Sequence, residues 1–400
     1  MSRTIHFRAV REAPIAGRIA RKEAPTGTEK ILSKTASGTI AVRKDRRRRM
    51  PDRRGVGSLQ PSSLQAEGQQ HDYADLKRLI VEAGLLDKQF AYYVFNTILV
   101  LTLLATSLTI LLVVGNSWLQ LLNAAFLAFV FTQIGFLGHD AGHRQIFNGA
   151  PRNDSFGLLP SLLLGLSRTW WIDTHNQHHA NPNDLDLDPH TALPIFAFSE
   201  EQAQSKRGLL RLLVAYQSLY FFPVLLLNGI GVRAASVQYL LRAEAKHRVV
   251  EASLIVLHAA LYLGVVFYAL SVGQALLFIL VHQALFGLYT GSVFAPNHKG
   301  MPTLDSDSQL DFVRRQVLTS RDVKAHPLTD FWYGGLNYQI EHHLFPSMPR
   351  NKLKKAQTIV RAFCAERSIP YREVGVLTSN REVLEYLHEV SASLREGKKA

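Results

Sequence analysis

Four apolar runs constrain the fold of this 400-residue chain more than any other feature. They cover about residues 93–114, 118–138, 253–270 and 274–295. A helix of about 20 apolar residues spans the hydrocarbon core of a bilayer, and in lipid its backbone polar groups must be satisfied within the segment. The sequence therefore predicts an all-α integral membrane protein with four transmembrane helices.

Short linkers pair these runs as two hairpins. The tips, residues 115–117 and 271–273, carry no charge. Lys and Arg residues gather instead beyond the other ends of the runs, in the N-terminal segment, the central loop and the C-terminal part. Because cytoplasmic loops carry an excess of Lys and Arg, we predict that both termini and the central loop face the cytoplasm.

A further apolar stretch, residues 209–232, has to stay on one side of the membrane for this topology to hold. It contains Arg211, Pro223 and Asn228, so we expect an interfacial or re-entrant segment. A fifth crossing here would place residues 339–343, after the fourth run, on the opposite side of the membrane from residues 139–143, after the second run. The run at 157–166 is too short to cross.

The polar parts of the chain define its domains. Mean hydropathy is only +0.02 although 47% of the residues are hydrophobic, because residues 1–70 are polar and hold most of the net charge of +13. Their composition predicts disorder. A transit peptide, a tail attracted to anionic lipids and an extension upstream of a start at Met50 are the alternatives, whereas nucleic-acid binding is not expected. We expect the membrane domain over residues 71–372 and a cytosolic C-terminal tail over 373–400.

The sequence contains three histidine clusters. One follows the second run, one lies in the central loop and one comes after the fourth run, so all three fall on one membrane face in this topology. They read HDAGH, HNQHH and QIEHH, with His139, His143, His175, His178, His179, His342 and His343 as candidate metal ligands. At i, i+3 and i+4 spacing, each cluster is expected to present its imidazoles in one direction from a helix. Seven imidazoles exceed the four positions of a tetrahedral zinc and suffice for two metal ions.

Histidines outside the three clusters have less support as metal ligands, because they lack the i, i+3 or i+4 spacing. His298 lies just beyond the fourth run on the same side, and we expect it to be a further ligand with Asn297 as a water-bridged neighbour. His258 and His282 lie inside spans, where buried hydrogen bonds, or for His282 the lining of an acyl channel, are expected. His190, like the remaining histidines, is expected to be an ordinary surface residue.

Two further features bear on the chemistry. Asp140, Asn176 and Glu341 stand next to candidate ligands, either to orient imidazoles or as solvated polar residues. Cys364 is the only cysteine, which excludes an intrachain disulfide and a four-cysteine iron–sulfur cluster, so electrons have to come from elsewhere. A GxGxxA pattern at 229–234 has no βαβ context and is interpreted as accidental.

HDAGH, HNQHH and GGLNYQIEHHLFP resemble the three histidine boxes of the membrane fatty acid desaturase family, over about residues 73–372. Gln339, in place of the first histidine of the third box, is similar to front-end desaturases, in which this Gln is taken as part of the iron environment. Eukaryotic front-end relatives carry a fused cytochrome domain with a His-Pro-Gly-Gly motif, whereas here His326-Pro327 is followed by Leu328. The chain therefore looks like the stand-alone, bacterial-type branch.

The resemblance implies a cytosolic helical cap that holds two non-haem Fe ions, with O2 as co-substrate. It also implies a fatty acyl substrate, on CoA or in a lipid, that gains a cis double bond in a kinked tunnel, and an external electron donor such as a ferredoxin or a cytochrome with its reductase. We expect Gly287 on the tunnel wall. Trp170 and Trp171 could cap the tunnel, but a place at the membrane interface is the preferred interpretation. No catalytic residue beyond the metal ligands is assigned. The alternatives are a di-iron lipid hydroxylase or ketolase, a membrane zinc sensor or transporter, and a haem electron carrier.

Overall fold

The computed structural model describes residues 63–242, 245 and 247–396. Most of the predicted N-terminal tail lies outside these residues, although helix α1 (Ser63–Glu82) begins inside the segment assigned to the tail. The described residues are mostly helical, with one two-stranded sheet. The prediction of an all-α fold is confirmed.

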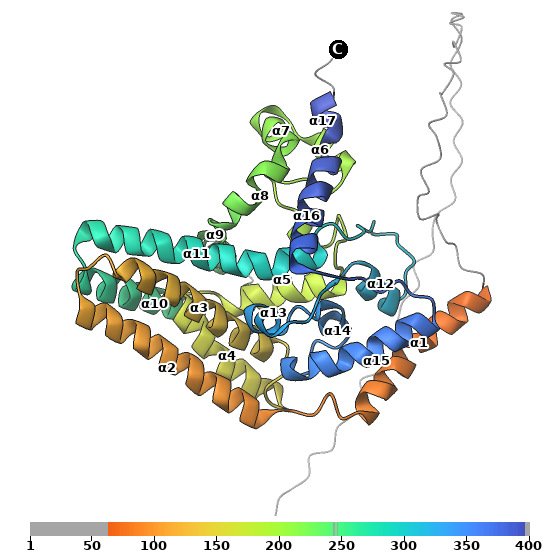
Figure 1. The fold of residues 1–400 in the computed structure, drawn as a ribbon, viewed down its shortest axis with the longest axis horizontal. Coiled ribbons are helices and arrows are strands. Elements are labelled where there is room, and N and C mark those ends of the chain that lie inside the picture. The colour runs from red at the N-terminus through yellow and green to blue at the C-terminus, as the bar shows by residue number, and fades with distance from the viewer. Residues whose placement is uncertain (1–62, 243–244, 246, 397–400) are drawn as a thin grey trace, which may run out of the picture. The chain divides into compact units, whose positions relative to one another are not determined.

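Four helices are long and apolar enough to cross a membrane, and each coincides with a predicted run. They are α2 (Phe90–Val114), α3 (Gln120–Gly142), α10 (Arg248–Ala269) and α11 (Val272–His298) (Figure 1). Helices α3 and α11 continue beyond the apolar runs. Their last turns contain His139 and His298, respectively. The second hairpin meets the first at its tip, where the Ser271 N–H donates to Asn116 Oδ1 at 2.8 Å.

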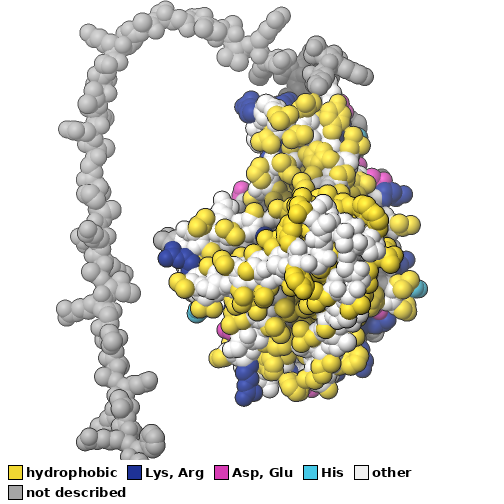
Figure 2. All heavy atoms as spheres, turned by 90° about the vertical axis from the view of Figure 1, so that its left-hand side faces the viewer, with side chains coloured by type: hydrophobic (Ala, Val, Ile, Leu, Met, Phe, Trp, Pro, Cys, Tyr) yellow, Lys and Arg dark blue, Asp and Glu magenta, His cyan; other side chains and the backbone are white. Residues whose placement is uncertain are grey.

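The four helices divide into an inner and an outer pair. Within their apolar windows, α3 and α11 are 56% and 44% buried, whereas α2 and α10 are 17% and 11% buried. The outer pair therefore presents apolar side chains to the surroundings, as a lipid-facing helix does. Seen from the hairpin tips, hydrophobic side chains cover most of this face and Lys and Arg lie mainly toward its edges (Figure 2).

Shorter helices cover the inner pair and lead into the central loop. Helix α4 (Ala150–Leu164) packs against α3, and a Cβ at Gly138 would lie 3.1 Å from Pro160. Next come α5 (Arg168–Ala180), the short η1 (Pro189–Thr191) and α6 (Glu200–Ser205). Helix α5 carries the second histidine cluster.

The stretch at 209–232 forms three helices instead of one straight span: α7 (Gly208–Ala215), α8 (Gln217–Leu225) and the start of α9 (Asn228–Leu240). Helices α7 and α8 meet at an angle of 93°. The GxGxxA pattern lies within α9, so it does not form the strand–turn–helix loop of a dinucleotide site. Gly287, expected on a tunnel wall, instead packs on this segment: a Cβ there would lie 2.6 Å from the Leu225 carbonyl oxygen.

The part after α11 supplies the third histidine cluster. It contains α12 (Phe312–Leu318), β1 (Asp322–Val323), α13 (Pro327–Trp332), α14 (Gln339–Leu344), η2 (Arg350–Lys352), α15 (Leu353–Glu366), β2 (Glu373–Val374), α16 (Val376–Val390) and α17 (Ala392–Glu396). The strands β1 and β2 pair in parallel, with Asp322 opposite Glu373.

Residues 373–396 are not the tail that the sequence predicts. Val383 and Leu387 of α16 are buried beside Phe221 of α8. Arg321, with no exposed surface, donates to Glu382 at 2.6 Å and also to the Pro296 carbonyl at the end of α11. Helix α16 is ordered because its apolar stripe has a partner and its Glu382 neutralises a buried cation.

Candidate metal centre

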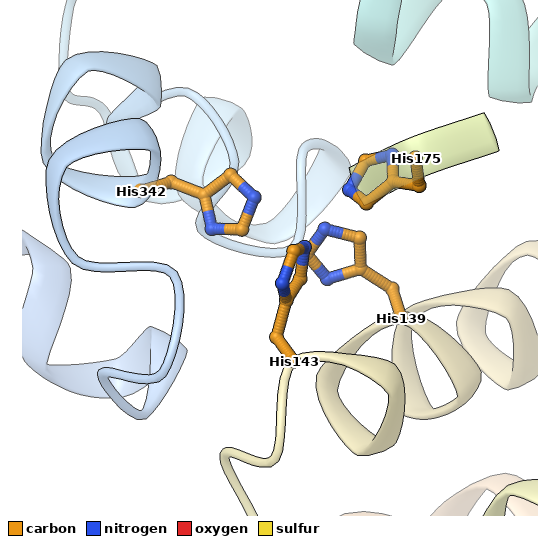
Figure 3. Close-up of side chains that lie close together, drawn as sticks. All are labelled: His139, His143, His175 and His342. Atoms are coloured by element: carbon orange, nitrogen blue, oxygen red, sulfur yellow. The ribbon is translucent and has the colours of Figure 1, made fainter. Parts of the chain in front are cut away.

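One group of four histidines brings together all three sequence clusters. His139 lies in the last turn of α3, His143 directly follows that helix, His175 comes from α5 and His342 from α14 (Figure 3). All four are buried, and one nitrogen of each lies within 4.8 Å of the others. We call this group site A.

A second group lies beside it. His178 of α5, His298 at the end of α11 and His343 of α14 are buried and also offer nitrogens within 4.8 Å of one another. The Nε2 atoms of His178 and His298 are 3.3 Å apart. We call this group site B.

The histidines of the second and third clusters are shared between the two sites, contrary to the expectation that each cluster points in one direction. His175 contributes to site A and His178 to site B, and likewise His342 and His343. His342 and His343 are adjacent and point about 100° apart around their helix, whereas His175 and His178 are about 60° apart in direction and lie about 4.5 Å apart along the axis of α5. His179 lies between the sites, with its Nε2 3.1 Å from His175 Nε2 and its ring stacked on His343 at 4.2 Å.

Proton positions can be assigned in site B from the atoms around each ring. Nδ1 of His178 lies 2.9 Å from an Asp188 carboxylate oxygen, and Nδ1 of His298 lies 3.1 Å from the Thr319 carbonyl. Nδ1 of His343 lies 2.9 Å from Gln316 Oε1, whose amide nitrogen donates to the carbonyl of His179. Acceptors at Nδ1 require Nδ1–H, so Nε2 of all three rings carries a lone pair that faces site B.

Burial keeps the imidazoles of the centre neutral. Burial, followed by the neighbouring imidazoles, holds the pKa of His143, His175, His179, His342 and His343 well below the usual histidine value. Neutral imidazole is the form that binds metals. Several buried ring nitrogens also have no hydrogen-bond partner: Nε2 of His139, His143 and His343, and both nitrogens of His342. Buried polar atoms without partners are rare, so this donor set fits two adjacent metal ions that accept imidazole.

Gln339 lies next to site B and is held by Asn297. Asn297, which is fully buried, donates to Gln339 Oε1 at 3.1 Å, and this places Gln339 Nε2 at 2.9 Å from His298 Nε2. Asn297 therefore orients the amide of Gln339 directly, whereas the sequence suggested a water-bridged neighbour of His298. Oxygen is the only metal-binding atom of Gln, so ligation by Gln339 requires the opposite amide orientation.

Asp188 orients a site B imidazole and was not singled out in the sequence. Its carboxylate accepts from His178 Nδ1 and from the Asn183 N–H, each at 2.9 Å. Burial raises its pKa, but His178, His190 and Lys299 together outweigh this effect, so the pKa of Asp188 lies well below the usual range. Asp184 and Asp186 occur in the same short stretch, and spacing alone does not single out Asp188.

The polar residues next to histidines of the clusters, Asp140, Glu341 and Asn176, differ in role. Asp140 is fully buried, with Oδ1 3.2 Å from His139 Nδ1 and Oδ2 3.0 Å from Arg350 Nε, so it orients a site A imidazole. Glu341 is also buried and accepts from the Tyr371 hydroxyl at 2.9 Å. Asn176 is exposed, as a solvated residue is.

Two residues near the centre make contacts that the sequence did not predict. His190, expected as an ordinary surface residue, places its ring 4.6 Å from that of His178 and groups with Asp188, although its own side chain is half exposed. Trp171, expected at the membrane interface, stacks on His175 at 4.3 Å, and a Cβ at Gly142 would meet its ring. Glycine at 142 thus allows this indole to lie against the metal centre.

Helix α5 is anchored to a membrane helix at its start. Glu251 in the first turn of α10 is 1% exposed and accepts from the Ser167 hydroxyl at 2.5 Å and from the Thr169 N–H at 3.1 Å. A carboxylate at a helix N-terminus satisfies its free N–H groups and its dipole. This link fixes α5 relative to the spans that carry the other ligands.

Comparison with known proteins identifies the family. The fatty acid desaturase family model matches residues 116–375. The chain is 31% identical over 336 residues to an acyl-lipid (9-3)-desaturase of Physcomitrium patens, covering 81% of this chain and 63% of the relative. It is 30% identical over 332 residues to the Delta(6)-fatty-acid desaturase fat-3 of Caenorhabditis elegans, covering 79% of this chain and 74% of that relative.

A third relative, a Delta 8-(E)-sphingolipid desaturase of Emericella nidulans, is 29% identical over 367 residues, which cover 83% of this chain and 65% of the relative. The chain thus spans about two thirds to three quarters of the length of these proteins. It belongs to the fatty acid desaturase family of oxidoreductases. The expected membership of the fatty acid desaturase family is confirmed.

Proposed function

We propose that this protein introduces a double bond into a long fatty acyl chain, using O2 and electrons from an external donor. The observation that carries the proposal is the pair of adjacent, buried imidazole groups at the ends of two membrane helices. In the balanced reaction, two adjacent methylenes lose two hydrogens, the donor supplies two electrons and two protons are taken up. O2 is reduced to two waters.

The residues proposed to hold two iron ions are those of sites A and B with His179 between them and Gln339 beside site B. The full set is His139, His143, His175, His178, His179, His298, Gln339, His342 and His343. A bound iron pair would supply the O2-derived oxidising power that an unactivated methylene requires. The chain contributes rigid orientation: Asp140, Asp188 and Gln316 each hold an imidazole by its Nδ1.

We further propose an acyl-lipid or acyl-CoA substrate that gains its double bond on the carboxyl side of an existing one. Support comes from Gln339 in the third box and from two relatives whose names place the double bond at Delta(6) and Delta 8. The name of the sphingolipid relative specifies an (E), or trans, double bond. Whether the product of this protein is cis or trans therefore has to be measured separately from the position of the double bond. Mass spectrometry of lipids from a host that expresses the chain would locate the double bond and report its geometry.

The active site is proposed to face the cytoplasm, where a soluble or membrane-bound electron carrier reaches it. This rests on the excess of Lys and Arg beyond the histidine ends of the spans and on uncharged hairpin tips. The 93° bend between α7 and α8 supports an interfacial or re-entrant segment at 209–232. We propose an electron carrier outside the membrane domain, either a ferredoxin or a cytochrome with its reductase, because Cys364 alone cannot form a four-cysteine iron–sulfur cluster there.

The decisive experiment uses the purified, iron-loaded protein with a reduced carrier, O2 and an acyl substrate. We expect a product two hydrogens lighter that forms only when all three are present. A product heavier by one oxygen would instead indicate the hydroxylase alternative. A preparation that binds zinc but no iron would contradict the proposal.

A further inference from the structure

A second group of polar side chains lies between α9 and the membrane helices α10 and α11, away from the metal centre. It contains Arg233 of α9, Tyr262 of α10, and His282 and Gln283 of α11, with His258 stacked on Tyr262. Along α11, Gln283 is about 22 Å from His298 at a rise of 1.5 Å per residue. The group is therefore separate from sites A and B, and nothing in the proposed reaction uses it.

The hydrogen bonds of this group fix the proton on His282. Arg233 Nη1 donates to Gln283 Oε1 at 2.7 Å, so the amide nitrogen of Gln283 faces His282 Nδ1 at 3.2 Å. The Tyr262 hydroxyl lies 2.7 Å from the same Nδ1. Nδ1 therefore accepts, and neutral His282 carries its proton on Nε2. That nitrogen is fully buried and has no hydrogen-bond partner, so the group holds an unused donor.

Arg233 adds a buried positive charge to this surplus of donors. Its Nη1 donates to the Gly229 carbonyl and to Gln283, and its guanidinium lies 5.4 Å from the Phe286 ring, but Nη2 is buried and has no partner. Within the described residues, no carboxylate forms an ion pair with Arg233. A cation surrounded by apolar helices and neutral partners is costly unless an anion accompanies it.

The two helices next to this group, α9 and α10, carry exposed apolar side chains. Ile230 and Val237 lie on the same stripe of α9 at i–3 and i+4, and are 55% and 45% exposed. Leu257 and Leu261 of α10, which packs against α9, are 45% and 55% exposed. A hydrocarbon chain lying along α9 and α10 would cover these side chains while its polar end reaches the guanidinium.

We propose that Arg233 is the anchor of a binding site for a lipid that carries an oxyanion, either the carboxylate of a fatty acid or the phosphodiester of a phospholipid. Nη2 of Arg233 becomes the donor to the oxyanion when the partly exposed side chain turns toward the surface, and the exposed side chains of α9 and α10 hold the acyl chain. A guanidinium suits this ligand because it stays charged and offers paired N–H donors to two oxygens. An oxyanion bound here neutralises the buried charge of Arg233. This proposal does not depend on the proposed reaction.

The test is a thermal-unfolding titration of the full-length protein after its lipids have been exchanged for detergent. Sodium oleate and dioleoylphosphatidylglycerol are the anionic probes, and methyl oleate and dioleoylglycerol are neutral controls of the same chain type. A ligand that binds the folded state raises the unfolding midpoint in a saturable way. We expect this rise with at least one anionic probe and not with the neutral ones, and the probe that acts identifies the source of the oxyanion.

Variants at position 233 assign the effect to this site. Arg233→Met keeps an unbranched apolar stem without the guanidinium and should abolish the rise. Arg233→Lys should weaken it, and Arg211→Met, which replaces an exposed arginine on α7, should retain it. Oleate in the acyl tunnel would instead stabilise wild type and Arg233→Met equally, and that result would overturn the proposal. If Arg233→Met cannot be purified, an equal response of the wild type to oleate and methyl oleate, or no response to either anion, would overturn it as well.

Discussion

The Nε2 atoms of His178 and His298 face each other at 3.3 Å, although the two residues are 120 positions apart in the chain. Their Nδ1 atoms are occupied by Asp188 and by the Thr319 carbonyl, so no proton lies between the two rings. Nε2 of His298 also accepts from Gln339 Nε2 at 2.9 Å, whereas no described group donates to Nε2 of His178, so a metal ion here would satisfy a buried lone pair that otherwise has no partner. This relationship argues for a metal ion at site B more strongly than the number of histidines does.

Removal of His178 should therefore deplete site B. We expect His178→Ala to lower the iron content from about two to about one per chain and to abolish desaturation, because His298 and His343 alone make a poor site. Metal analysis of the purified protein measures the first effect and product formation the second. His388→Ala, at an exposed position of α16, is the control and should keep both irons. Two irons retained in His178→Ala would contradict the assignment.

Asp188 should act through His178. Asp188→Asn replaces the carboxylate that accepts the Nδ1 proton, so we expect a loss of about 10- to 100-fold in iron affinity or activity with the fold preserved. Asp186→Asn is a matched control, since Asp186 is exposed in the same loop. Iron titration separates the two variants, and equal iron affinity in both would assign Asp188 a purely structural role.

Gly287 should tolerate no side chain. A Cβ at this position would lie 2.6 Å from the Leu225 carbonyl oxygen and 2.7 Å from the Gly229 nitrogen, both backbone atoms. We expect Gly287→Ala to lower the unfolding temperature, with the chain length of the accepted substrate unchanged in the protein that remains folded. Gly264→Ala, where a Cβ meets open space on α10, should leave the unfolding temperature nearly unchanged. A shortened substrate range without loss of stability would restore Gly287 to the tunnel wall.

The orientation of residues 209–232 is testable by labelling. If this segment does not cross the membrane, single cysteines placed at Lys206 and at Arg242, in a chain whose Cys364 is replaced by Ser, should both react from the cytoplasmic side only. Both positions lie outside the bent helices and are exposed or partly so. An impermeant thiol reagent applied to cells and to inside-out vesicles gives the readout. Labelling from opposite sides would break the one-sided arrangement of the histidine clusters.

Cys364 should report on unfolding of the cap. It is fully buried in α15, and burial raises the pKa of its thiol to about 12, above the usual value. We expect negligible alkylation of the folded protein at pH 8 and rapid alkylation in denaturant, because only the thiolate reacts. In the unfolded chain the thiol ionises at a lower pH than in the folded one. Its contribution to stability is therefore present below about pH 9 and is lost as the pH rises toward 12.

The sequence by itself determined the elements whose pattern is local. The four spans follow from uninterrupted apolar runs that bilayer thickness requires, and the ligand types follow from histidine spacing that chance seldom produces. The resemblance of HDAGH, HNQHH and QIEHH to the desaturase boxes led to the family. None of these inferences depends on how distant segments meet.

Tertiary structure decided which atoms face which. The division of His175 and His178 between two sites depends on the placement of α5 against α11 and α14, which the interval between histidines does not encode. The role of Asp188 among several similar aspartates, the close contact at Gly287 and the order of α16 likewise depend on partners far away in the chain. Periodicity specifies which side of a helix is apolar, but the residue that meets it from another helix is set only when the helices pack together.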